Sequence, residues 1–218
     1  MIPAVIPIME PQDYLRDPCR ASSLSFRKTN DTIIPENMLI LRDDELHNAH
    51  SDGIDDPYFK LIHRMKQVEC LPLPEGFEII QCNAEDLTDH IRECYDEVNI
   101  SAEILRRNEM APGYDPGLRI AVSERNRKKI IASGIAEYDP QVREGILDWI
   151  QVSPAYRRRN LGRFIVCELL HRLQGKADFV TVSGRVNNLD HPLELYESCG
   201  FTDLMIWHII TRIDTHRI

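Results

Sequence analysis

The sequence predicts a mixed α/β fold in which helices alternate with the strands of one sheet. Two observations lead to this prediction. Short β-branched runs such as Phe179–Ser183 (FVTVS) are typical of buried strands. Between such runs lie amphipathic segments bounded by helix start and stop residues, of which Leu161–Gln174 is the clearest. At 43% hydrophobic and 28% charged residues, the chain has the composition of an ordinary globular protein.

Residues 1–75 are the least regular part, rich in proline and without continuous periodicity. We expect a short strand at Asn37–Leu41 and a helix at Tyr58–Val68, where apolar residues recur at helical spacing. The stretch Cys70–Gly76 (CLPLPEG) predicts a linker between this N-terminal extension and a domain of residues 76–218. The extension could pack across that domain, cover an active site or pair two copies of the chain as a homodimer.

The remaining elements follow from local patterns. Asn83 is a candidate N-cap, and Gly200 is placed to stop the last helix. The turn DPQVRE, which joins two of the strands, predicts an antiparallel hairpin. The expected strands are 77–82, 118–123, 129–138, 145–152, 179–183 and 204–213, and the expected helices are 83–95, 100–107, 161–174 and 192–199.

The stretch from Val152 to Gly175 predicts a phosphate-binding site. A strand ends, a turn of three arginines and Asn160 follows, and an amphipathic helix begins at Leu161. Unpaired N–H groups at a helix start suit phosphate or pyrophosphate. Positive charge there opposes the helix dipole, and an anionic ligand would offset that cost. Asn160 and Gly162 tolerate the left-handed or crowded backbone that such a loop needs.

The same stretch resembles motif A of the GNAT superfamily of N-acetyltransferases, written Q/R-x-x-G-x-G/A between a strand and a helix. The matching residues are Arg157, Arg158, Arg159, Asn160, Leu161 and Gly162. Asn160 departs from the pattern, because it stands where the family has its first glycine. Asn187–Phe201 (NNLDHPLELYESCGF) resembles motif B, in which an Asn leads into a helix ending LYxxxGF. The resemblance covers residues 76–218 and implies a GNAT-like acyl-CoA N-acyltransferase fold with an N-terminal extension.

The resemblance implies a binding site for acetyl-CoA as co-substrate. The backbone of Ile150, Gln151 and Val152 would pair with the pantetheine arm, and Asn187 would help to hold the pantetheine or the substrate. The amides from Arg158 to Arg163 would bind the pyrophosphate. Tyr196 occupies the position of the family's general acid, and a phenol can protonate a departing thiolate.

Direct attack by an amine on a thioester requires a neutral amine, and a lysine-like amine is neutral in only about one part in a thousand at neutral pH. A base is therefore expected, and Glu137 and Asp148 lie on the two predicted strands beside the pantetheine. Simple alternation places Asp148 on the same face as Ile150. For each carboxylate, an ordinary solvated role is the competing interpretation.

Composition excludes other classes. The net charge of -9 argues against nucleic acid as the main partner. No run is long enough to span a bilayer, and the N-terminus lacks the basic leader of a signal peptide. The six scattered cysteines suit reduced thiols in a cytoplasmic protein. No HExxH, nucleophile elbow, P-loop lysine or Rossmann glycine pattern is present, so we expect no metal.

The sequence therefore predicts an N-acetyltransferase that transfers an acetyl group from acetyl-CoA to a small-molecule amine or peptide acceptor in a ternary complex. The alternatives are a non-catalytic acyl-CoA-binding or regulatory module, with the extension plugging the acceptor site, and a scaffold without ligand affinity. Fold resemblance alone does not separate them.

Overall fold

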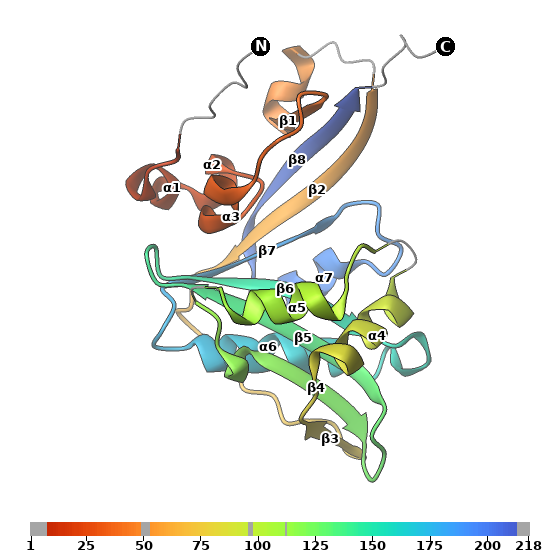
Figure 1. The fold of residues 1–218 in the computed structure, drawn as a ribbon. Helices are drawn as coiled ribbons and strands as arrows, with labels where there is room; N and C mark the ends of the chain where they lie inside the picture. Colours follow the sequence, from red (N-terminus) through yellow and green to blue (C-terminus); the bar gives the residue numbers. More distant parts are fainter. Residues whose placement is uncertain (1–7, 49–52, 96–97, 112, 213–218) are drawn as a thin grey trace, which may run out of the picture.

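The computed structural model describes residues 8–48, 53–95, 98–111 and 113–212. Within these ranges the strands form one eight-stranded sheet in the order β1-β8-β2-β7-β6-β5-β4-β3 (Figure 1). Among the described residues, only β6 and β7 pair in parallel. The strands are β1 (Met38–Arg42), β2 (Gly53–His63), β3 (Phe77–Ile80), β4 (Arg119–Glu124), β5 (Ile130–Asp139), β6 (Glu144–Val152), β7 (Phe179–Arg185) and β8 (Thr202–Arg212).

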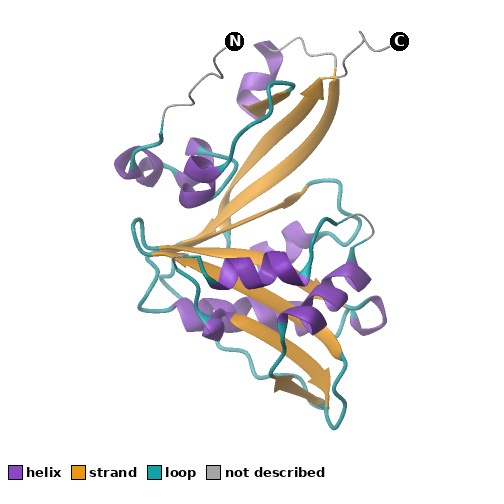
Figure 2. Cartoon of the chain, in the orientation of Figure 1, coloured by secondary structure: helices purple, strands orange, loops and turns teal. Residues whose placement is uncertain are grey.

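Helices cover both faces of this sheet (Figure 2). On one face α6 packs over β5 and β6, and its apolar side chains join the largest core cluster together with α7. On the other face α4 and α5 form a second cluster with Ile135, and the N-terminal helices form a third with Ile62 and Phe179. The helices are α1 (Pro11–Arg16), α2 (Pro18–Ala21), α3 (Phe26–Asp31), α4 (Ala84–Cys94), α5 (Ala102–Glu109), α6 (Leu161–Leu173) and α7 (Pro192–Ser198), with 3-10 turns η1 (Asp43–Asn48), η2 (Pro116–Leu118) and η3 (Pro154–Tyr156).

The mixed α/β fold class is confirmed, as are the elements predicted from residue 77 onward, with end shifts of a few residues. The Asn83 side chain caps α4 by accepting from the Asp86 N–H group at 2.7 Å, as expected for an N-cap. Gly200 has a φ of +89°, which fits its role in ending α7. The strand predicted at Asn37–Leu41 is β1.

The helix predicted at Tyr58–Val68 is wrong, because this segment contains most of strand β2. Phe59, Ile62 and Met65 have helical spacing, but Phe59 and Ile62 lie on opposite faces and join different core clusters. The segment is extended because β2 hydrogen-bonds on both edges, to β7 and to β8.

A buried polar network fixes the N-terminal helices to the sheet. The Lys60 ammonium, on β2, donates to the Tyr14 hydroxyl at 3.1 Å and to the carbonyls of Pro18, Ser22 and Leu24 at 2.6 to 2.9 Å. The Tyr14 hydroxyl in turn donates to Glu144 at 2.8 Å. Residues before the predicted linker at 70–76 thus share one sheet and one polar network with residues after it.

Candidate active site

Strands β6 and β7 separate at the centre of the sheet. Their parallel pairing runs from Glu144 opposite Phe179 to Leu147 opposite Val182. Beyond that point β6 continues to Val152, while β7 stays paired with β2. Figure 2 shows the strands on the two sides of β7 fanning apart. The segment 148–152 of β6 is therefore left without β7 along one edge.

A bulge in β6 lies where the two strands part. The pairing of β5 with β6 shifts between Ser133 and Ile135, and Trp149 has a φ of +49°. A bulge bends the strand and re-aims its side chains. As a result Asp148 and Trp149 line one pocket, whereas Ile150 packs into the core beneath α6. The expectation that Asp148 shares a face with Ile150 is wrong, because alternation does not hold across a bulge.

The free edge of β6 presents backbone groups to the gap. The Ser153 N–H group bonds to the Ile131 carbonyl at 2.8 Å, so by antiparallel alternation the N–H and C=O of Val152 point away from β5. The Val152 carbonyl accepts from Arg157 Nε at 3.2 Å. The Ile150 carbonyl accepts from the Tyr95 hydroxyl at 3.1 Å. Gln151 instead turns its side chain to Ser133, in a buried network.

The loop before α6 has the left-handed backbone expected of a tight anion-binding turn. Asn160 has a φ of +62°, as the sequence predicted, and Arg158 has a φ of +63°. The first helical hydrogen bond joins the Phe164 N–H group to the Asn160 carbonyl at 3.0 Å. The N–H groups of residues 161–163 precede that bond and lie at the positive end of the helix dipole.

Two arginines of this loop, and Arg163 in the first turn of α6, already have partners. Arg157 bridges the two sides of the gap by pairing with Asp190 at 2.6 Å, and Arg163 pairs with Glu69 at 2.7 Å. The Arg159 guanidinium lies 5.1 Å from the centre of the Tyr156 ring. A bound polyanion would therefore compete with Asp190 for Arg157.

Gly162 lies where two helices pack together, whereas Asn187 lies on the surface. A Cβ atom on Gly162 would lie 3.3 Å from Leu195, so this glycine lets α6 and α7 approach closely. Asn187 is exposed, two residues after the end of β7.

Tyr196 lies on α7, 6% exposed, with its ring 6.1 Å from Phe59 and 5.7 Å from Phe201. Burial raises its pKa, as do the nearby Tyr95 and Asp148. The phenol therefore stays protonated across the physiological range, as a proton donor must. The structure shows that Tyr196 packs against Phe59 and Phe201, while its role as the acid stays a prediction.

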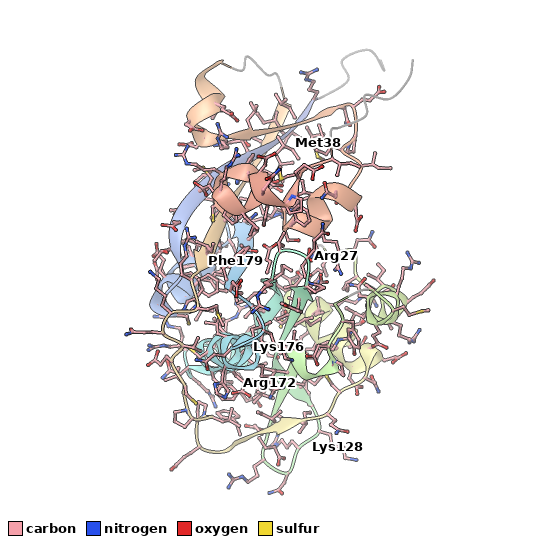
Figure 3. The ribbon with its side chains drawn as sticks, turned by 90° about the vertical axis from the view of Figure 1, so that its left-hand side faces the viewer. Arg27, Met38, Lys128, Arg172, Lys176 and Phe179 are labelled. Atoms are coloured by element: carbon pink, nitrogen blue, oxygen red, sulfur yellow. The ribbon has the colours of Figure 1, made fainter. Side chains whose placement is uncertain are left out.

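Glu137 and Asp148 face the same pocket from β5 and β6, together with Trp149 and Tyr114. Its free volume is about 20 Å³, roughly enough for one water molecule. The N-terminal helix α3 closes it. Arg27 pairs with Glu137 at 2.6 Å, and Lys28 pairs with Asp148 at 3.1 Å. Figure 3 shows Arg27 where the N-terminal helices meet the rest of the molecule.

Several residues of this region were not found from the sequence. Arg27, Lys28 and Tyr95 reach the site from segments distant in sequence. His90, on α4, is buried and contacts the Ser133 hydroxyl at 2.8 Å and the Ser153 hydroxyl at 3.1 Å. Burial lowers the pKa of His90 to about 4, so it is neutral. No local pattern in the sequence marks these contacts.

Two further observations concern the described ranges alone. They contain no helix both long and apolar enough to cross a membrane. Over the same ranges, no three His, Cys, Asp or Glu side chains gather in a way that could hold a metal ion.

Comparison with known proteins identifies the fold. Residues 116–203 match the family model described as acetyltransferase (GNAT) domain. A GCN5-related N-acetyltransferase from Sphaerobacter thermophilus superimposes with a TM-score of 0.63 at 16% identity, covering 81% of this chain and 60% of that one. A GNAT-family acetyltransferase from Colwellia psychrerythraea gives 0.55 at 13% identity, with 85% and 69% covered.

A Drosophila protein gives a TM-score of 0.56 at 17% identity, with 76% of this chain and 54% of that one covered. The chain thus spans less than two thirds of the first two structures it resembles. At these identities the structural matches establish the fold alone. No curated protein sequence matched significantly.

Proposed function

We propose that this chain, whose residues 116–203 match the acetyltransferase (GNAT) domain model, is an acetyltransferase that transfers an acetyl group from acetyl-CoA to an amine by direct attack in a ternary complex. The observation that carries the proposal is the parting of β6 and β7 directly before a left-handed loop and the start of α6. In such a gap the pantetheine arm of acetyl-CoA can lie along the unpaired edge of β6. The N–H groups at the start of α6 can then donate to the phosphates of the same molecule.

The residues present fit acetyl-CoA. The amides from Arg158 to Arg163 would receive the pyrophosphate, and Arg157 would exchange Asp190 for a phosphate oxygen. The backbone of Ile150 and Val152 would hold the pantetheine arm, with Asn187 at the mouth of the gap. The segment from Val152 to Asp148 leads from the loop to the carboxylates, and the bulge at Trp149 makes it shorter than the about 13 Å of a regular strand.

The reaction needs one group that takes a proton from the amine and another that donates a proton to the thiolate. Asp148 lies beside the end of the gap, and Glu137 shares its pocket, so either carboxylate can take a proton from the attacking ammonium. Tyr196 stays protonated and can donate to the departing thiolate. A carboxylate thus takes the proton from nitrogen, and Tyr196 gives a proton to sulfur.

Thiol release from acetyl-CoA, measured with a panel of small amines, amino acids and lysine peptides, tests this function. We expect amine-dependent thiol release with an equal amount of N-acetylated product. Thiol release without acetylated amine would indicate hydrolysis and would contradict the proposal.

One observation favours a second function, a non-catalytic acyl-CoA-binding module. Arg27 and Lys28 neutralise both candidate bases, and the pocket between them is nearly filled. This alternative predicts acetyl-CoA binding with no turnover of any amine in the panel.

A further inference from the structure

Helix α3 holds a primary amine inside the candidate active site. Lys28 Nζ lies 3.1 Å from Asp148 Oδ2, and the side chains of Lys28 and Asp148 are 36% and 30% exposed. Asp148 is the first residue of β6 after its last pair with β7. The lysine nitrogen therefore lies at the closed end of the gap, paired with one of the two carboxylates proposed to deprotonate the acceptor.

The position of α3 is fixed by buried contacts rather than by the Lys28 pair. The Phe26 N–H group donates to Glu144 at 3.0 Å, and the Phe26 ring lies 5.4 Å from Tyr14. The preceding helix α2 is held by Trp207, on β8, which donates to the Cys19 carbonyl at 2.9 Å. The residue before Lys28, Arg27, pairs with Glu137. An amine held this way has a high effective concentration at the site.

The chain's other lysines are placed differently. Lys60 is buried with four oxygen partners, Lys129 pairs with Glu93, and Lys176 pairs with Asp115. Lys66 and Lys128 are exposed. Figure 3 shows Lys128 at the lower end of the molecule, away from Arg27, which lies near its middle and directly precedes Lys28. Within the described ranges, Lys28 is the lysine that pairs with a carboxylate of the candidate site.

We propose that Lys28 is an acceptor of this site, and that the chain acetylates it within the same molecule. This inference rests on the proposed function. Lys28 Nζ gives up one proton to Asp148 and attacks the thioester carbonyl carbon. The N–C bond forms, the C–S bond breaks, and the amide nitrogen loses a second proton to solvent. Tyr196 protonates the thiolate and regains its proton from water, and Asp148 gives its proton to solvent. The reaction occurs once per chain and yields acetyl-lysine, CoA and one released proton.

The charges around Lys28 predict how the reaction depends on pH. Asp148 on β6 raises the pKa of Lys28, with Glu137 on β5 acting in the same direction and Arg27 on α3 opposing it. The ammonium is thus kept protonated at neutral pH, and the rate should rise with pH as the neutral amine forms. Once acetylated, Lys28 carries no charge, and Asp148 is released from its ion pair.

The test is incubation of the full chain with acetyl-CoA, followed by peptide mass mapping over time. We expect acetylation at Lys28 at least about tenfold faster than at Lys66 and Lys128, which report chemical acetylation in the same sample. The first-order rate should not change with protein concentration, because the reaction is intramolecular. Lys28→Arg, which keeps the positive charge, should abolish this label, and Asp148→Asn should slow it at Lys28 without changing the exposed lysines.

Two outcomes would overturn the inference in distinguishable ways. If Lys28 is labelled no faster than Lys66 while the protein acetylates added amines, the self-acetylation is refuted and the proposed function stands. If neither Lys28 nor any added amine is acetylated, the proposed function fails and the inference fails with it.

Discussion

Replacing Tyr196 by Phe removes the proposed proton donor while leaving its packing in place. The ring lies between Phe59 and Phe201, and phenylalanine keeps these contacts. General acid catalysis contributes about 10² to 10⁴ in rate. The variant should therefore lose this factor in kcat, about 3 to 5 kcal/mol of transition-state stabilisation, with the affinity for acetyl-CoA nearly unchanged.

Initial rates of thiol release and calorimetric titration of acetyl-CoA, on the same preparations, check this prediction. Tyr138→Phe is the matched control, because it deletes a hydroxyl whose bond is to the Lys176 carbonyl, outside the site. Thermal melting confirms that both variants are folded. A Tyr196→Phe protein with the turnover of the control would remove Tyr196 from the mechanism.

Three further predictions concern anchoring, pH and the mouth of the gap. Lys60→Met strips the charged partner from a buried network and should lower the unfolding free energy by about 3 to 5 kcal/mol in denaturant titrations; a change below about 1 kcal/mol would contradict this. His90 has its pKa lowered from 6.5 to about 4, so the unfolded chain protonates first, and about 3 kcal/mol of stability should be lost as pH falls from 6.5 to 4. In His90→Gln the free energy of unfolding should fall less between pH 6.5 and 4. If it falls as steeply as in the unchanged protein, this pH dependence does not come from His90. Asp190→Asn frees Arg157 and should tighten acetyl-CoA binding a few-fold, as expected for a half-exposed ion pair; weaker binding would show that Asp190 supports the site instead.

The sequence predicted the elements whose signals are local. The helix start at Leu161, the cap at Asn83 and the left-handed Asn160 each follow from residues within one turn of the chain. Strand β2 was missed because its extended form depends on pairing with β7 and β8, more than a hundred residues away. Its accidental helical spacing outweighed any local strand signal.

The candidate site was predicted in part for the same reason. The left-handed backbone at Asn160 was predicted, while the roles of the loop and of the carboxylates stay predictions. The bulge at Trp149 that separates Asp148 from Ile150 cannot be recognised from simple alternation along a strand. The contacts of α3 with Glu137 and Asp148 join residues 110 and 120 positions apart. Such pairings depend on how the N-terminal segment packs, which no local pattern encodes.

The most direct test of the central claim is calorimetric titration of the full chain with acetyl-CoA, CoA and a pantetheine that lacks the nucleotide phosphates. The account predicts micromolar binding of acetyl-CoA and CoA, and much weaker binding of the phosphate-free analogue, because the loop at Arg157–Arg163 holds the pyrophosphate. Absence of acetyl-CoA binding, or equal affinity for the phosphate-free analogue, would contradict the assignment of this gap and loop as the cofactor site.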